Sequence, residues 1–178
     1  ITGDSAGDDF GTSVSISGDG MTLAVGARVP AVDPYFGAGA PGAPGVTDRP
    51  GYVEVYYKQP DSSWLLAETF TGEANGDEFG RSVSMSEDGK TLAIGAPFND
   101  DNGSDSSGEG VYLREFNNDL TPVNTEFLIN KIKNGNQGTS SVHLANNGDY
   151  VVVWRDADGA DGDTFGVYGR MFNKGGVP

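Results

Sequence analysis

The sequence contains no cysteine, one histidine and few basic side chains, and each shortage excludes a class of function. Without cysteine, the protein has no disulfide scaffold, no thiol catalysis and no cysteine-ligated zinc. With His143 as the single histidine, most metallo-hydrolase and catalytic-triad arrangements lack a ligand or a base. Lysine and arginine number 11 against 26 acidic residues, a net charge of −15. Because an acidic surface repels phosphate, we expect no nucleic-acid partner and a preference for divalent cations.

Long apolar runs are also missing from the chain. No segment approaches the roughly 18 apolar residues of a membrane helix, so we expect no membrane insertion. Hydrophobic residues make up 36% of the 178 positions, which is low for a globular protein, although aromatic residues are present. The abundant residues are glycine (28), aspartate (18) and asparagine (12), all of which favour turns. The composition therefore predicts an all-β protein that is rich in turns and has a thin core.

The sequence repeats itself at a shift of 69 residues. Residues 1–27 and 70–96 align without a gap and are identical at 17 of 27 positions. A third and divergent copy runs through residues 140–156 and 166–176. A period of this length indicates tandem structural units. We place repeat 1 at residues 1–69, repeat 2 at 70–130 and repeat 3 at 131–178.

Each repeat is predicted to be a four-stranded antiparallel meander. The first strand alternates serine with apolar residues, the pattern of a half-buried strand. An Asp-Gly or Asn-Gly hairpin turn then leads into a short apolar run, which predicts a central, buried strand. No window shows the period of a capped helix, so we expect almost no helix. The expected strands are residues 13–17, 22–26, 52–57 and 64–69 in repeat 1, 82–86, 91–95, 111–116 and 126–129 in repeat 2, and 150–154 and 167–172 in repeat 3.

The first two repeats share a motif. It reads Asp-Asp-Phe-Gly at 8–11 with Gly-Ala at 26–27, and Asp-Glu-Phe-Gly at 77–80 with Gly-Ala-Pro at 95–97. This motif resembles the FG-GAP repeat. FG-GAP repeats build the β-propeller of integrin α-subunits and occur in many secreted or cell-surface proteins. The resemblance therefore implies propeller blades and a secreted or cell-surface location. Repeat 1 departs from the motif at Arg28, where the motif has proline, and repeat 3 has lost both halves.

Three units are fewer than the roughly four to eight blades that close a propeller. The chain also starts in mid-unit, because residues 1–3 correspond to residues 70–72 of repeat 2. We therefore predict an all-β fold of tandem four-stranded antiparallel meander blades, of the β-propeller type, in an incomplete ring or an open array. The expected partners are further copies of the chain or adjacent blades of a longer chain.

Calcium is the candidate ion, although the family's usual calcium loop is not present here. The connection between the first two strands of each repeat is too short for that loop and is predicted to be a hairpin turn. Two other loops place side-chain oxygens at alternate positions, the spacing that a hard cation needs. Each is a candidate Ca²⁺ site with a dissociation constant of about 10⁻⁴–10⁻³ M, the alternative being a solvated acidic turn. The candidate ligands are Asp156, Asp158, Asp161 and Asp163 in one loop and Asn99, Asp101 and Asp105 in the other.

Three further residues are candidates for surface contacts. Asn102 begins an Asn-Gly-Ser glycosylation sequon, and a glycan there would obstruct a cation nearby. Residues 28–50 form a Gly/Pro-rich insertion that we expect to be a long surface loop. Within it, Tyr35 and Phe36 are candidates for docking on sugar or on a neighbouring subunit. The alternative is a tolerated insertion without a role.

The remaining conspicuous side chains point to packing and not to catalysis. Trp64 and Trp154 are expected to pack in the core or between blades, and His143 is expected on the polar side of its strand. We find no nucleophile with a base and no P-loop. We therefore expect a non-enzymatic extracellular module with a structural or adhesive role. The alternative is a calcium-dependent β-propeller that binds an extracellular protein or glycan, and a polysaccharide-acting enzyme has no positive support.

Overall fold

The computed structural model describes residues 1–4, 8–29, 50–75, 77–89, 91–99, 110–116, 121, 127–130, 137–156 and 166–174. Over these ranges the chain forms eleven β-strands and no helix. Accordingly, no helix in the described part of the chain is long and apolar enough to cross a membrane. The predicted all-β class is confirmed.

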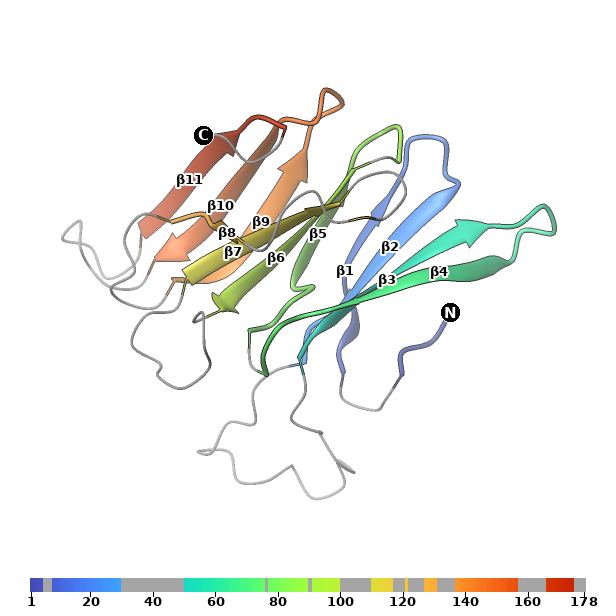
Figure 1. Cartoon of the computed structure of the whole chain (residues 1–178), viewed down its shortest axis with the longest axis horizontal. Helices are drawn as coiled ribbons and strands as arrows, with labels where there is room; N and C mark the ends of the chain where they lie inside the picture. Colours follow the sequence, from blue (N-terminus) through green and yellow to red (C-terminus); the bar gives the residue numbers. More distant parts are fainter. Residues whose placement is uncertain are drawn as a thin grey trace, which may run out of the picture.

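The strands form three antiparallel sheets, which we call blades 1, 2 and 3 (Figure 1). Blade 1 contains β1 (Phe10–Ile16), β2 (Thr22–Ala27), β3 (Tyr52–Lys58) and β4 (Trp64–Thr71), in that order. Blade 2 contains β5 (Ser82–Met85), β6 (Leu92–Asn99), β7 (Gly110–Phe116) and β8 (Phe127–Leu128). Blade 3 contains β9 (Gln137–Leu144), β10 (Tyr150–Asp156) and β11 (Gly166–Phe172). The four-stranded meander predicted for repeats 1 and 2 is confirmed, and the described residues of repeat 3 form three strands.

The strand register repeats along with the sequence. Val14 pairs with Val25 in blade 1, Val83 pairs with Ile94 in blade 2, and Val142 pairs with Val152 in blade 3. The turns before the second strands also match, since Gly20, Gly89 and Gly148 have φ angles of 69°, 67° and 88°. The hairpin turns predicted from Asp-Gly and Asn-Gly are therefore confirmed.

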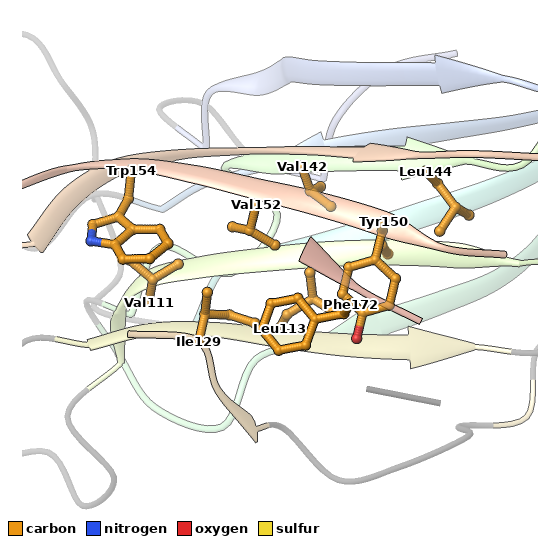
Figure 2. Packing of buried hydrophobic residues seen from close by; sticks show 10 residues of the cluster. Val111, Leu113, Ile129, Val142, Leu144, Tyr150, Val152, Trp154 and Phe172 are labelled. Atoms are coloured by element: carbon orange, nitrogen blue, oxygen red, sulfur yellow. The ribbon is translucent and has the colours of Figure 1, made fainter. Parts of the chain in front are cut away.

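The blades lie in a row, with their first strands next to one another. β1 contacts β5, and β5 contacts β9 (Figure 1). We call the contact between blades 1 and 2 the first joint, and the contact between blades 2 and 3 the second joint. Each joint contains an apolar core. The core of the first joint comprises Ala24, Val53, Val55, Phe79, Val83, Met85, Leu92, Ile94 and Ala96. The core of the second joint, shown in Figure 2, comprises Ala93, Val111, Leu113, Ile129, Val142, Leu144, Tyr150, Val152, Trp154 and Phe172.

Which residues are buried depends more on contacts between blades than on the alternation of polar and apolar residues in the sequence. β2 lies inside its sheet and is buried from Ala24 to Ala27, as predicted for a central strand. β5 was predicted to be half-buried, which is wrong, because all four of its residues are buried between the two neighbouring blades. His143 is exposed between buried neighbours, and Trp154 packs in the second joint, both as predicted. Trp64 is half-buried at the start of β4 and belongs to neither core.

Candidate functional site: the joints between blades

The first joint brings the backbone of blade 2 against glycines of blade 1. A Cβ atom added at Gly26 would lie 2.1 Å from the carbonyl oxygen of Gly80, and one added at Gly51 would lie 2.0 Å from that of Phe79. The hydroxyl of Ser13 donates a hydrogen bond of 2.6 Å to the same Gly80 oxygen. Real Cβ atoms do not approach backbone oxygens this closely, so glycine at positions 26 and 51 sets how near the blades can come.

Phe79 is the aromatic anchor of the first joint. Its side chain is 0% exposed and belongs to the same core as Ala24, Val53 and Val55 of blade 1. Gly80, the next residue, has a φ of 86°, a conformation that favours glycine. The Phe-Gly dipeptide of repeat 2 therefore packs on the second and third strands of blade 1, where it meets Gly26 of the Gly-Ala dipeptide of repeat 1. The two halves of the motif come together across a joint.

In blades 1 and 2, one serine binds a backbone amide of the following blade. The amide of Met85 donates to Oγ of Ser15 at 2.9 Å, across the first joint. The amide of Leu144 donates to Oγ of Ser84 at 3.0 Å, across the second joint. Ser15 and Ser84 are 69 residues apart, so one hydrogen bond recurs at the repeat period. Each bond satisfies an amide that the interface would otherwise bury without a partner.

The second joint lacks one of the bonds found in the first. Ser82 is the counterpart of Ser13, because each pairs with the glycine of its second strand, Gly95 or Gly26. Among the described residues, the hydroxyls of Ser82 and Ser140 are buried without a hydrogen-bond partner. A buried hydroxyl without a partner destabilises the fold by about 1–3 kcal/mol. The second joint is therefore held less well by polar contacts at this position.

Arg28 joins the first two blades by ion pairs. One guanidinium nitrogen lies 3.0 Å from Oδ2 of Asp9 in repeat 1, and another lies 3.4 Å from Oε1 of Glu78 in repeat 2. Arg81 also pairs with Glu78, whose side chain is 10% exposed. Sequence reasoning noted Arg28 only as a departure from the motif and missed this role. The sequence did contain a signal for it. Positions 9 and 78, which are equivalent in the two repeats, are both acidic, and arginine replaces the proline of the motif at position 28.

The hairpin tips also touch across both joints. The amide of Gly18 donates to the carbonyl oxygen of Glu87 at 2.7 Å, and the side-chain amide of Asn146 donates to the Glu87 carboxylate. Within the first tip, Asp19 accepts hydrogen bonds from the Ser17 hydroxyl and the Met21 amide, which hold the pKa of Asp19 below its usual value. Asp19 thus acts as a turn residue, as expected from the Asp-Gly pattern.

A network of tyrosines and carboxylates lies in blade 1. The hydroxyl of Tyr52 donates to Oδ2 of Asp8 at 2.6 Å and accepts from the amide of Asp4 at 3.0 Å. The hydroxyl of Tyr56 donates to the carboxylate of Glu54, which is 4% exposed. Burial, and then these neighbouring carboxylates, raise the pKa of both tyrosines above the usual value. The network ties the first residues of the chain to β3.

The predicted calcium, glycan and partner residues fall almost entirely outside the described residues. Asn99 ends β6 and Asp156 ends β10, two strands whose arrowheads point to the same edge of the array (Figure 1). Nothing is described of their side chains. In the described ranges, no group of three or more histidines or acidic residues is placed to hold a metal ion. The predictions that lie wholly outside these ranges concern Tyr35, Phe36, Asp101, Asn102, Asp105, Asp158, Asp161 and Asp163.

Comparison with known proteins bears on the first two blades. The model of the FG-GAP repeat matches residues 3–40 and 71–113. No curated protein matches the sequence.

Two solved structures resemble the fold at low sequence identity. The periplasmic gluconolactonase PpgL of Pseudomonas aeruginosa shares 15% identity with a TM-score of 0.48, covering 83% of this chain and 37% of that one. U3-55K shares 9% identity with a TM-score of 0.34, covering 94% of this chain and 53% of that one. The chain thus spans less than two thirds of either protein, and likenesses this weak assign it neither a ligand nor an activity.

The matched segments contain the structural features of the first joint. Residues 3–40 hold Ser13, Ser15, Gly26 and Arg28, and residues 71–113 hold the Phe-Gly dipeptide that packs against them. Both halves of the motif found in the sequence therefore belong to the matched segments. Residues 3–40 and 71–113 thus match the FG-GAP repeat, and they include the first two strands of blade 1 and the first two strands of blade 2.

Proposed function

We propose that the chain is a non-enzymatic structural or adhesive scaffold module of a secreted or cell-surface protein, built from FG-GAP-type blades that assemble with other blades. One observation carries the proposal: the residues that the two repeats share most clearly lie in a joint between blades. Gly80 lies against Gly26 and Phe79 lies against Gly51, while Ser15 and Ser84 bind amides of the following blade. The residues that the repeats share therefore make the contacts between blades, and this supports a role in building an array.

The charge distribution is consistent with that role. The cores of both joints consist of aliphatic and aromatic residues and methionine, while the net charge of the chain is −15. Strong net charge keeps exposed surfaces hydrated and apart, which suits a module that associates only through specific faces. FG-GAP repeats are also typical of extracellular and cell-surface proteins, which supports the proposed location.

An experiment on the intact protein tests this proposal. Antibodies raised against the chain should label unpermeabilised cells or the extracellular matrix around them. A Gly26→Val variant, which breaks the first joint, should be incorporated several-fold less than the wild type. A Gly169→Ala variant serves as the control, because Gly169 is itself exposed and pairs with the exposed Val153. Labelling confined to the cell interior, or equal incorporation of all three proteins, would contradict the proposal.

The second candidate function is calcium-dependent binding of an extracellular protein or glycan. It is favoured by the oxygen-rich segments that follow Asn99 and Asp156, at the ends of equivalent strands in neighbouring blades. Under this candidate, millimolar Ca²⁺ raises the melting temperature and EDTA reverses the rise. The Asp158→Asn/Asp161→Asn variant should lose that response, while Asp61→Asn, in an exposed turn of blade 1, should keep it. If neither calcium nor EDTA changes the melting temperature, this candidate function is contradicted.

A further inference from the structure

The outer face of blade 1 has the same composition as the face of blade 2 that packs against blade 1. Six side chains of blade 2 enter the core of the first joint from one side of that blade. Each has a counterpart in blade 1, 69 residues earlier, with the same strand register. We call these counterparts the acceptor face. They are Phe10, Val14, Ile16, Leu23, Val25 and Ala27, matching Phe79, Val83, Met85, Leu92, Ile94 and Ala96.

Part of the acceptor face is open, whereas its counterpart in blade 2 is closed. Val14 is 63% exposed and Ile16 is 52% exposed. The matching residues Val83 and Met85 are 8% and 7% exposed, because blade 1 covers them. Isolated exposed apolar residues are common on protein surfaces. Here, however, two of them lie on one side of an edge strand, and the equivalent side of β5 is covered by a neighbouring blade.

The first joint shows what kind of surface covers such a face. Blade 1 presents Ser13 and Ser15 from β1, and Ala24 and Gly26 from β2, with valines of β3 beside them. The serines bind backbone groups of the arriving blade, and the glycine admits its Phe-Gly carbonyl. Blade 2 presents the same type of surface to blade 3, since Ser84 and Gly95 occupy the positions of Ser15 and Gly26.

Blade 3 does not present that surface on its own outer side. His143 pairs with Val151 as Ser84 pairs with Ala93, so histidine stands where the other blades have serine. Val153 pairs with Ser141 as Gly26 pairs with Ser13, so valine stands where the other blades have glycine. At Gly26 even a Cβ atom would lie 2.1 Å from the approaching carbonyl oxygen, and Val153 has a whole isopropyl group, 40% exposed.

We propose that the acceptor face of blade 1 docks a further four-stranded blade of the FG-GAP type, one that presents serine and glycine as Ser15 and Gly26 do. The outer face of blade 3 is a terminus, because His143 and Val153 prevent the same docking. The array therefore extends from blade 1 only, and the partner is not blade 3 of a second copy. This inference rests on the proposed assembly role and adds its direction and the surface of its partner.

The test gives blade 3 the surface that the proposal says it lacks. In the full chain, His143→Ser/Val153→Gly should form head-to-tail oligomers that grow with concentration in sedimentation velocity, whereas the wild type stays monomeric. His143→Ser/Val153→Ala is the matched control and should stay monomeric, because alanine restores the Cβ that the joint cannot hold. Circular dichroism melts establish that each variant is folded.

A second substitution locates the contact on the acceptor face. Ile16→Glu, added to the associating variant, should abolish the oligomers, while Leu65→Glu should leave them, because Leu65 is 59% exposed but outside the acceptor face. Monomeric His143→Ser/Val153→Gly at all concentrations would overturn the proposal. Wild-type oligomers lost with Ile16→Glu would also overturn it, because a second copy would then fill the face. Neither of these sedimentation results would contradict the proposed function, which is tested separately by the cell-surface labelling experiment.

Discussion

Gly26 of β2 lies under the carbonyl oxygen of Gly80, the residue that follows the buried Phe79 of the next blade, so closely that an added Cβ would be 2.1 Å from that oxygen. This contact explains why both glycines of the motif are needed. Gly80 adopts a φ of 86°, and Gly26 leaves the space that its carbonyl enters. The motif is thus a device for close packing between blades.

Gly26→Ala should lower the free energy of unfolding by about 1–3 kcal/mol, the usual range for an overpacked interior. The nearest atoms to the new methyl group are a backbone carbonyl and the Ser13 hydroxyl, so neither can move away without opening the joint. Gly169→Ala is the control, because its nearest neighbours are a side-chain methyl of Val153 at 3.2 Å and a backbone oxygen at 3.6 Å, both much farther away than the nearest atoms around Gly26. Urea unfolding of both variants measures the difference, and equal stabilities would contradict the close packing.

Ser13→Ala should destabilise the protein and Ser82→Ala should not, although the two residues are equivalent. Ser13 donates to the Gly80 carbonyl oxygen, so its loss should lower the free energy of unfolding by about 0.5–1.5 kcal/mol. The buried Ser82 hydroxyl finds no hydrogen-bond partner among the described residues, so its removal should leave stability unchanged or raise it. Denaturant titration of the pair checks the sign. A larger loss from Ser82→Ala than from Ser13→Ala would contradict the difference between the joints.

Arg28→Met should weaken the first joint by less than about 1 kcal/mol, since partly exposed ion pairs contribute little. Arg81 still neutralises Glu78 in this variant, which limits the loss. The difference from the wild type should shrink further in high salt, because salt screens exposed charges. A double-mutant cycle with Glu78→Gln isolates the coupling across the joint, and a coupling of zero at low salt would show that Arg28 does not bridge the blades.

The buried tyrosines of blade 1 predict a loss of stability in alkali. Tyr52 and Tyr56 have a raised pKa in the folded state, so unfolding releases protons once the pH exceeds the ordinary tyrosine value of about 10. Their contribution is complete below that pH and declines as the pH rises toward the folded-state value. Tyr52→Phe/Tyr56→Phe should therefore lose less stability between neutral and strongly alkaline pH. A wild type whose tyrosines all titrate near the ordinary value by ultraviolet absorbance would contradict this.

Much of the fold could be predicted from the sequence because the repeat is long and its turns are explicit. The 69-residue shift located the strands, and Asp-Gly at 19–20 and 88–89 located two hairpins. The alternation of serine and apolar residues in β1 indicated which side chains lie on the same side of the strand. It did not indicate which side is covered by another blade. That depends on the neighbouring blade, so the burial of β5 on both sides was missed.

The site was harder to predict for the same reason. Ser15 and Ser84 read as the polar side of a strand, and nothing local shows that they bind an amide of the next blade. Arg28 read as a lost proline, since its partners Asp9 and Glu78 are brought together only by stacking. The calcium ligands, including Asp158 and Asp161, remain predictions because they lie outside the described residues.

Amide hydrogen exchange at three equivalent positions tests the central claim, that the repeated residues form joints between blades. Met85 and Leu144 donate their amides to serines across the joints, whereas Ile16 holds the same position on the open acceptor face. Measured residue by residue by NMR on the full chain, Met85 and Leu144 should exchange at least about tenfold more slowly than Ile16, since about 1.4 kcal/mol of additional protection corresponds to that factor. Equal exchange at all three amides would contradict the account.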